Sequence, residues 1–211
     1  MNKIITVDGP AGSGKGKISK YIAKKYNFYH LDSGILYRRL AFELTKKGIE
    51  ATDINKIKSF IRTNSTIKIT KSVSLRQEKI GFFASEIAKF DFVRNYINSQ
   101  QKVITKSCIK KAGFVIDGRD IGSVVFKNAF LKLYIEVDII IRAKRRYKQL
   151  IDNGEKSIYR KILEDIKLRD KKDKTRKHSP LVIPKGAIII DNSQSFRRTT
   201  QQIIKIIGNM N

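Results

Sequence analysis

Residues 7–26 read VDGPAGSGKGKISKYIAKKY, and this stretch decides the fold class. Hydrophobic or small residues 4–7 lead into Asp8, a glycine-rich segment ends at Gly14-Lys15, and helical spacing begins directly afterwards. The apolar positions that follow share one helical face: Ile18, Tyr21, Ile22 and Tyr26. The pattern predicts a strand, then a loop that binds phosphate groups, then a helix N-terminus.

Gly9, Gly14 and Lys15 satisfy the spacing G-x-x-x-x-G-K of a P-loop. In such a loop the backbone N–H groups face phosphate oxygens, the helix N-terminus adds a positive dipole, and the lysine reaches the β- and γ-phosphates. We expect the whole loop to bind ATP: Gly9, Pro10, Ala11, Gly12, Ser13, Gly14, Lys15, Gly16 and Lys17. GTPases and motor-type ATPases need Ser or Thr at position 16, so Gly16 favours a kinase of a small acceptor.

The composition is strongly basic, with 45 Lys and Arg against 19 Asp and Glu and a net charge of +26. Basic residues are spread along the whole chain, which is typical of solvated faces, although a nucleic-acid surface is the alternative. Cys108 is the single cysteine, which excludes an internal disulfide and fits a cytoplasmic protein. No run approaches the roughly 18 apolar residues of a membrane helix, so we expect no membrane association.

Periodicity predicts alternating strands and helices along the chain. The expected strands cover residues 2–7, 28–31, 66–70, 114–116, 130–137 and 187–190. The expected helices cover residues 15–26, 35–47, 53–62, 75–111 with a break near 90, 138–151, 157–172 and 196–207. This alternation favours a parallel sheet covered on both faces, with ligands at the carboxyl ends of its strands. The polar clusters 9–16, 32–34 and 117–123 all directly follow expected strands.

Six segments resemble the bacterial cytidylate kinase family, within the nucleoside monophosphate kinases. They read VDGPAGSGKG, HLDSGILYRRLA, FASEIAKFDFVR, VIDGRDIGSVVF, RAKRRYKQL and RDKKDKTR…PL, and together they span nearly the whole chain. The resemblance implies an α/β P-loop kinase fold with a parallel five-stranded sheet. It also implies transfer of the γ-phosphoryl group of ATP to CMP or dCMP, with Mg²⁺, by a cytoplasmic monomer that binds no nucleic acid.

The chain departs from the family pattern at two places. Lys17 stands where the family has Thr after Gly-Lys-Gly, and the insert is shorter than usual, at about residues 62–90. We expect one P-loop kinase domain over 1–211, with an acceptor-binding region at about 32–111 and a lid at about 147–165. Lys17 either supplies a charge to the phosphates in place of the hydroxyl or is merely tolerated.

The resemblance implies three groups of acceptor contacts. Arg38, Arg119 and Arg176 would grip the phosphate of CMP, because guanidinium forks bind phosphate bidentately. Cytosine presents an amino donor at N4 and acceptors at N3 and O2, and the residues that would read it are Ser85, Arg94 and Asp120. Ser33 would make a further nucleotide contact, and Arg169 and Asp173 would lie near the sugar, although they also form a plain i,i+4 helix pair.

The remaining residues implied by the resemblance concern catalysis. Lys15, Arg119, Arg142 and Arg146 would stabilise charge on the transferred group, and Arg142, Arg145 and Arg146 have a spacing that lets them converge on one helical face. A solvated basic face is the alternative for these lid arginines. Asp117 would hold magnesium through water, or would cap a turn.

Two other functions stay open from the residues alone. One is a kinase of another small acceptor such as UMP, against which Arg94 and Asp120 argue. The other is a nucleic-acid-binding P-loop ATPase, suggested only by the charge.

Overall fold

A computed structural model of the chain describes residues 3–67, 75, 77–107, 110–152 and 154–210. The chain separates into two compact units, one formed by residues 1–31 with 111–211 and the other by residues 32–110. The expected strand at 66–70 falls mostly outside the described residues, as does Cys108.

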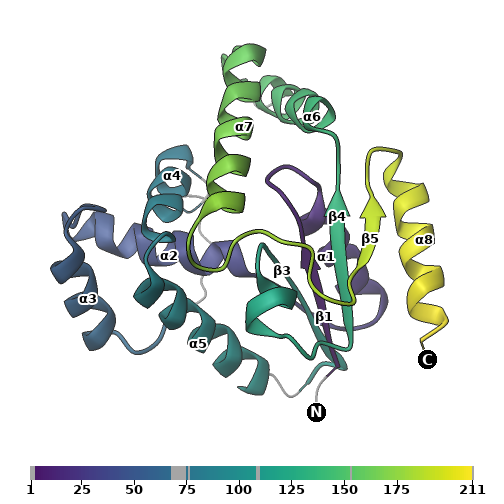
Figure 1. Ribbon diagram of the computed structural model, residues 1–211, viewed down its shortest axis with the longest axis horizontal. Coiled ribbons are helices and arrows are strands. Elements are labelled where there is room, and N and C mark those ends of the chain that lie inside the picture. The colour runs from purple at the N-terminus through teal and green to yellow at the C-terminus, as the bar shows by residue number, and fades with distance from the viewer. Residues whose placement is uncertain (1–2, 68–74, 76, 108–109, 153, 211) are drawn as a thin grey trace. The chain divides into compact units, whose positions relative to one another are not determined.

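A five-stranded sheet in the order β2-β3-β1-β4-β5 is the centre of the first unit (Figure 1). Its strands are β1 (Lys3–Asp8), β2 (Tyr29–Asp32), β3 (Gly113–Gly118), β4 (Leu131–Glu136) and β5 (Ile188–Asp191). β1 runs parallel to both β3 and β4, and β4 runs parallel to β5. The register pairs Val7 with Asp117 and Asp8 with Gly118. The loops after β1 and β3 therefore lie side by side at the carboxyl ends of these strands.

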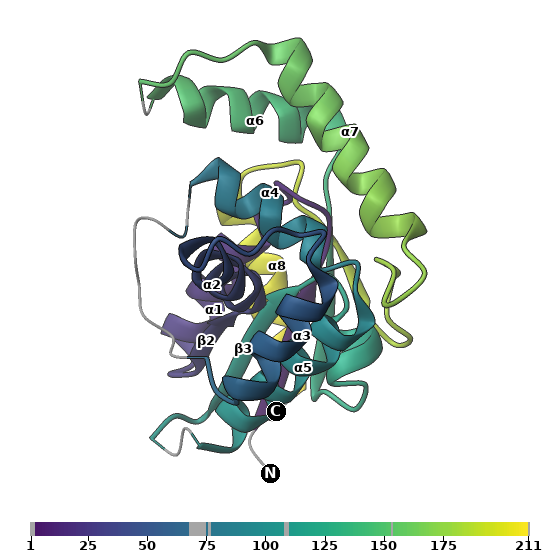
Figure 2. The same cartoon turned by 90° about the vertical axis from the view of Figure 1, so that its left-hand side faces the viewer.

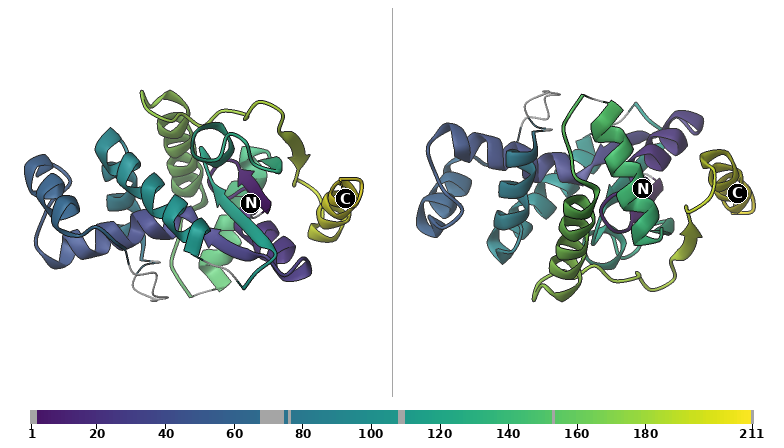
Figure 3. Two further views of the ribbon diagram at one scale, coloured as in Figure 1. Left: turned by 90° about the horizontal axis from the view of Figure 1, so that it is seen from below. Right: turned by 90° about the horizontal axis from the view of Figure 1, so that it is seen from above.

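The α-helices described in this unit are α1 (Lys15–Lys25), α6 (Ile139–Asp152), α7 (Tyr159–Thr175) and α8 (Phe196–Gly208). α6 and α7 pack against each other as a helical pair (Figure 2), around a small core that includes Ala143, Leu150 and Ile162. α8 lies beside the edge strand β5 (Figure 3) and is capped by Ser195, whose side chain accepts from the Arg198 N–H.

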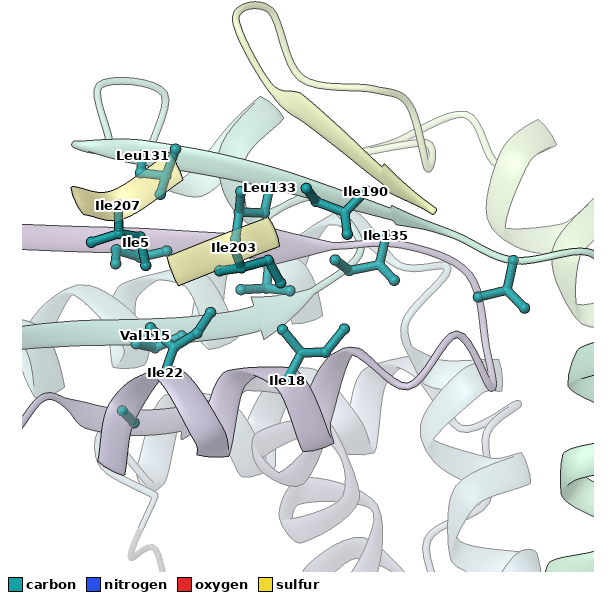
Figure 4. Packing of buried hydrophobic residues seen from close by; sticks show 13 residues of the cluster. Ile5, Ile18, Ile22, Val115, Leu131, Leu133, Ile135, Ile190, Ile203 and Ile207 are labelled. Carbon is teal, nitrogen blue, oxygen red and sulfur yellow. The ribbon is translucent and has the colours of Figure 1, made fainter. Parts of the chain in front are cut away.

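The main core lies between the sheet and the apolar stripes of α1 and α8. Ile18 and Ile22 of α1 and Ile203 and Ile207 of α8 point at one face of the strands (Figure 4). The sheet residues that meet them alternate along their strands: Ile5, Val7, Val115, Leu131, Leu133, Ile135 and Ile190. Because side chains on a strand alternate between faces, this pattern leaves Thr6 and Asp8 on the opposite face. Burial of this stripe fixes where α1 begins, and so fixes the loop before it.

The second unit is helical, with α2 (Ser33–Lys46), α3 (Ile54–Thr63), α4 (Glu78–Ile87) and α5 (Asp91–Ser107). α2 packs against α4 and α5, and α3 packs against α5. Asp32 caps α2, because its side chain accepts the N–H of Gly34 at 3.0 Å. The side chain of Asp32 is therefore the N-cap of α2.

The structure departs from the predicted elements in one segment near the site. Ile121–Val125, shortly after β3, form a π-helical turn, η2, that is not among the predicted elements. The cause is distant in sequence: both carboxylate oxygens of Asp8 accept N–H groups from this turn.

Candidate active site

The P-loop connects β1 to α1 and has a backbone that requires glycine. Gly14 stands at the N-terminus of α1 with φ of 82°, a left-handed conformation that residues with a side chain rarely adopt. A Cβ atom at Gly9 would lie 2.5 Å from the carbonyl oxygen of Ile135, so the loop passes too close to β4 for a side chain. The ammonium group of Lys15 donates to the carbonyl of Pro10 at 3.2 Å, within the same loop. The sequence-predicted strand, loop and helix are thus all present.

Asp8 is fully buried at the end of β1 and ties the P-loop strand to the turn after β3. Its carboxylate accepts the N–H groups of Ile121 and Gly122 at 2.9 and 2.7 Å. Burial raises the pKa of Asp8 from its ordinary 3.8 to about 6, because the charged form loses solvation, although the two N–H groups and Lys15 oppose the shift. Nothing local in the sequence indicates this role of Asp8, since its partners lie far along the chain.

Asp117 ends β3 and is almost completely buried. Its Oδ1 lies 2.6 Å from Nε2 of His30 on β2. A Cβ atom added to Gly16 would lie 3.7 Å from its Oδ2, so this oxygen faces the first turn of α1. A carboxylate oxygen in that position fits a magnesium ion held through water beside the P-loop. Nothing local in the sequence indicates this role of His30, because its partner lies 87 residues away along the chain.

Four charged residues gather after β3 and at the end of α7, and we call them the acceptor cluster: Arg119, Asp120, Asp173 and Arg176. Nε of Arg119 donates to Asp173 at 2.8 Å, and Nη1 of Arg176 donates to the other oxygen of Asp173 at 3.3 Å. Nη2 of Arg176 lies 3.9 Å from Asp120. The structure thus brings these four sequence-predicted residues together.

Within the acceptor cluster, Arg119 and Asp173 stabilise each other's charge. Burial disfavours the charge of Arg119, but the hydrogen bond to Asp173 and the negative charges of Asp173, Asp170 and Asp117 together outweigh it and raise the pKa of Arg119. Burial alone would raise the pKa of Asp173, yet Arg119, Arg176 and Arg169 together lower it. Arg169 is itself exposed on α7. Both Arg119 and Asp173 are therefore ionised at neutral pH.

The other expected acceptor residues lie in the helical unit. Ser33 is buried at the start of α2, and Ser85 is half-buried on α4. Nη1 of Arg38 donates to the carbonyl of Leu75 at 2.9 Å, and its guanidinium lies against Gly81, where a Cβ atom would approach it to 2.6 Å. Arg94 is 2% exposed, with its guanidinium carbon 5.8 Å from the Tyr37 ring centroid. Within this unit both arginines are therefore held by specific neighbours.

The three lid arginines of α6 have different partners. Arg142 is buried and donates to the carbonyls of Ala11 and Val137 and, at 2.6 Å, to Asp170. The guanidinium of Arg145 donates to the carbonyls of residues 192–194, in the loop between β5 and α8. Arg146 donates to Gln149 on its own helix. The expectation that their heads converge on one face is not met in this structure, because Arg142 supports the P-loop backbone and Arg145 the loop after β5.

Lys17 is exposed on α1, and its ammonium lies 4.2 Å from the centroid of the Phe196 ring. The ring of Tyr21 meets the same phenylalanine edge-on at 5.7 Å. An ammonium over an aromatic face is attracted by the ring quadrupole. The structure therefore gives Lys17 a contact with α8, which favours a packing role over the expected phosphate contact.

Among the residues that the structure describes, no group of three or more His, Cys, Asp or Glu residues has the geometry to hold a metal ion by itself. Among the same residues, no helix combines the length and the apolar character needed to span a bilayer.

Comparisons with known proteins establish the family of the chain. The family described as "Cytidylate kinase" matches residues 5–210. The cytidylate kinase of Rickettsia akari is 40% identical over 209 residues, covering 99% of this chain and 93% of that protein. The cytidylate kinase of Rickettsia bellii is 41% identical over 208 residues, covering 98% and 93%. The crystal structure of TT1252 from Thermus thermophilus shares the fold with a TM-score of 0.52 at 12% identity, covering 100% and 98%. The chain belongs to the cytidylate kinase family.

Proposed function

We propose that this chain is an enzyme that transfers the γ-phosphoryl group of ATP to CMP or dCMP, giving CDP or dCDP. One observation carries the proposal: the register of β1 and β3 sets the P-loop beside the loop that bears Arg119 and Asp120. The family match over nearly the whole chain supports it. Transfer between two nucleotides requires a loop that binds the donor phosphates beside charged groups that bind the acceptor phosphate. The P-loop and the acceptor cluster meet this need at the carboxyl ends of the strands.

The residues of the chain supply position and charge, since phosphoryl transfer needs little covalent chemistry from a protein. Lys15 would stabilise the negative charge that develops on the transferred phosphoryl group. Arg119 and Arg176 would hold the phosphate of the acceptor in line with that group. No general base is needed, because the attacking phosphate oxygen is already anionic. Arg142 and Arg146 are assigned as further catalytic arginines. Magnesium bound with ATP would neutralise phosphate charge, and Asp117 is the residue assigned to hold it through water.

Base selection is assigned to Asp120, Ser85 and Arg94. Asp120 is buried, so its oxygen can pair with the N4 amino group of cytosine with little competition from water. Uracil presents an acceptor at that position, which would leave the carboxylate facing a carbonyl oxygen. From the family resemblance we assign further acceptor contacts to Ser33, Arg38, Arg169 and Asp173. We also propose a cytoplasmic monomer with its lid at about 147–165 and its acceptor-binding region at about 32–111.

A coupled assay of ATP consumption with AMP, GMP, UMP, CMP and dCMP as acceptors tests the proposal. We expect fast turnover with CMP and dCMP and turnover at least about tenfold slower with the others. Equal turnover with UMP would contradict the base assignment. ATP hydrolysis that needs no acceptor and rises with single-stranded nucleic acid would replace the proposal with a nucleic-acid-dependent ATPase.

A further inference from the structure

Asn192, the first residue after β5, has a hydrogen-bond partner for each of its four polar groups. Its backbone N–H donates to the carbonyl of Glu136 at 2.9 Å, and its backbone carbonyl accepts from Arg145 at 2.8 Å. Its side-chain Nδ2 donates to the carbonyl of Ser13 at 2.8 Å, and its Oδ1 accepts from the hydroxyl of Thr199 at 2.9 Å. The residue therefore joins the P-loop to β4, α6 and α8.

The chemistry of the partners fixes the orientation of this side chain. The carbonyl of Ser13 can only accept, so the amide nitrogen of Asn192 must face it. The amide oxygen then faces Thr199, whose hydroxyl must donate to it. The same hydroxyl lies 3.3 Å from the carbonyl of Ser195, and we assign its single proton to the shorter contact with Asn192. Asn192 and Thr199 are 5% and 2% exposed, so water cannot replace either bond readily.

This contact acts on one peptide group of the P-loop. The carbonyl of Ser13 and the N–H of Gly14 belong to the same planar unit, so holding one fixes the direction of the other. Gly14 also lies directly against the asparagine, because a Cβ atom there would be 2.5 Å from Nδ2 of Asn192. In a P-loop such N–H groups hold the phosphates, and Lys15 follows immediately.

We propose that Asn192 and Thr199 are positioning residues that aim the P-loop at the phosphates of ATP. We call this pair the Asn192–Thr199 brace. It acts through Ser13 and Gly14, and it rests on the proposed use of ATP as donor. Without the brace, the peptide group between Ser13 and Gly14 can rotate, and the N–H of Gly14 no longer points in one direction. The brace therefore affects the binding of ATP, whereas the binding of the acceptor does not depend on the brace.

Thr199→Val tests the brace, because valine keeps the shape of threonine and removes only the hydroxyl. Thr200→Val is a matched control: Thr200 is also buried on α8, but its hydroxyl lies 2.9 Å from the carbonyl of Phe196 in its own helix. We expect Thr199→Val to raise the KM for ATP about fivefold, the usual effect of one lost hydrogen bond. The KM for CMP should stay unchanged, and Thr200→Val should leave both values unchanged.

Two further variants separate positioning from general stability. Thr199→Ser keeps the hydroxyl that donates to Asn192, so the KM for ATP of this variant should stay within about twofold of the parent value. Asn192→Asp should raise it by about tenfold or more, because a carboxylate oxygen would face the carbonyl of Ser13. Melting temperatures of all the variants identify any that are simply less folded, and a KM for CMP that rises together with that for ATP would indicate such damage and overturn the brace.

Calorimetric titration with ATP alone makes the outcome independent of the acceptor. If CMP is not the acceptor, the parent fails the acceptor assay, yet Thr199→Val should still bind ATP about fivefold more weakly. If Thr199→Val and Thr200→Val bind ATP equally well, the brace is wrong, whatever the acceptor assay shows.

Discussion

The P-loop and the acceptor cluster lie at one edge of the sheet but are held in different ways. The P-loop contacts are hydrogen bonds from Lys15, Arg142 and Asn192 to backbone carbonyls. The acceptor cluster is held by charges of opposite sign on Arg119, Asp173 and Arg176. Bonds to fixed carbonyls give the donor loop one geometry. Ion pairs between side chains can exchange partners when a phosphate dianion arrives, so the acceptor side can rearrange around its ligand.

The largest effect is expected on the donor side. Lys15→Ala should lower kcat by about a thousandfold or more, because the ammonium is assigned to charge that develops in transfer. Binding of CMP, measured by calorimetry, should stay within about twofold, since the acceptor cluster contains no P-loop residue. A variant that turns over within tenfold of the parent would remove the P-loop from catalysis.

The next largest effect is expected on the selection of the acceptor base. Asp120→Ala should reduce the preference for CMP over UMP, expressed as a ratio of kcat/KM, by about tenfold or more. The substitution removes both the partner of cytosine N4 and the repulsion against uracil O4. The KM for ATP should not change. The assay is the acceptor panel repeated on the variant, and an unchanged ratio would assign base reading to other residues.

Asp8 connects the two sides and should make stability depend on pH. Its pKa in the folded protein is raised to about 6, above the ordinary 3.8, so the folded state binds this proton more tightly than the unfolded state. The stabilising effect of the proton is therefore complete below about pH 4 and is lost as pH rises through 6. The shift corresponds to roughly 3 kcal/mol at most.

Asp8→Asn removes this titration. Between pH 4.5 and 7.5 the free energy of unfolding of the parent should fall relative to that of the variant, and urea unfolding at several pH values measures the difference. A constant effect of losing one acceptor for the N–H groups of Ile121 and Gly122 cancels from that comparison. Parallel pH profiles would show that Asp8 does not carry a raised pKa.

The smallest effect is expected at Lys17. Lys17→Thr loses the ammonium contact with Phe196, so unfolding should become easier by about 0.5–1 kcal/mol. The KM for ATP should be the same in the parent and the variant at low and at high salt. A KM that rises in the variant, and rises more at low salt, would instead restore the phosphate contact expected from the sequence.

The sequence predicted the P-loop and nearly all described strands and helices, because these depend on local spacing and periodicity. The contacts that complete the site are of another kind. His30 meets Asp117 across two strands, Asp8 holds a turn after β3, and Asn192 reaches Ser13. Each contact joins segments far apart in the chain, and each residue is unremarkable in its own segment. Arg142 shows the same limit, since its spacing indicates a helical face but not the carbonyl that it binds.

Transfer of a labelled phosphoryl group tests the central claim most directly. The parent protein is incubated with ATP labelled in its γ-phosphate, CMP and magnesium, and the labelled products are separated. The account predicts that the label appears in CDP at the rate at which ADP forms, and that Lys15→Ala abolishes both. Label recovered as inorganic phosphate, at a rate that CMP does not change, would contradict it.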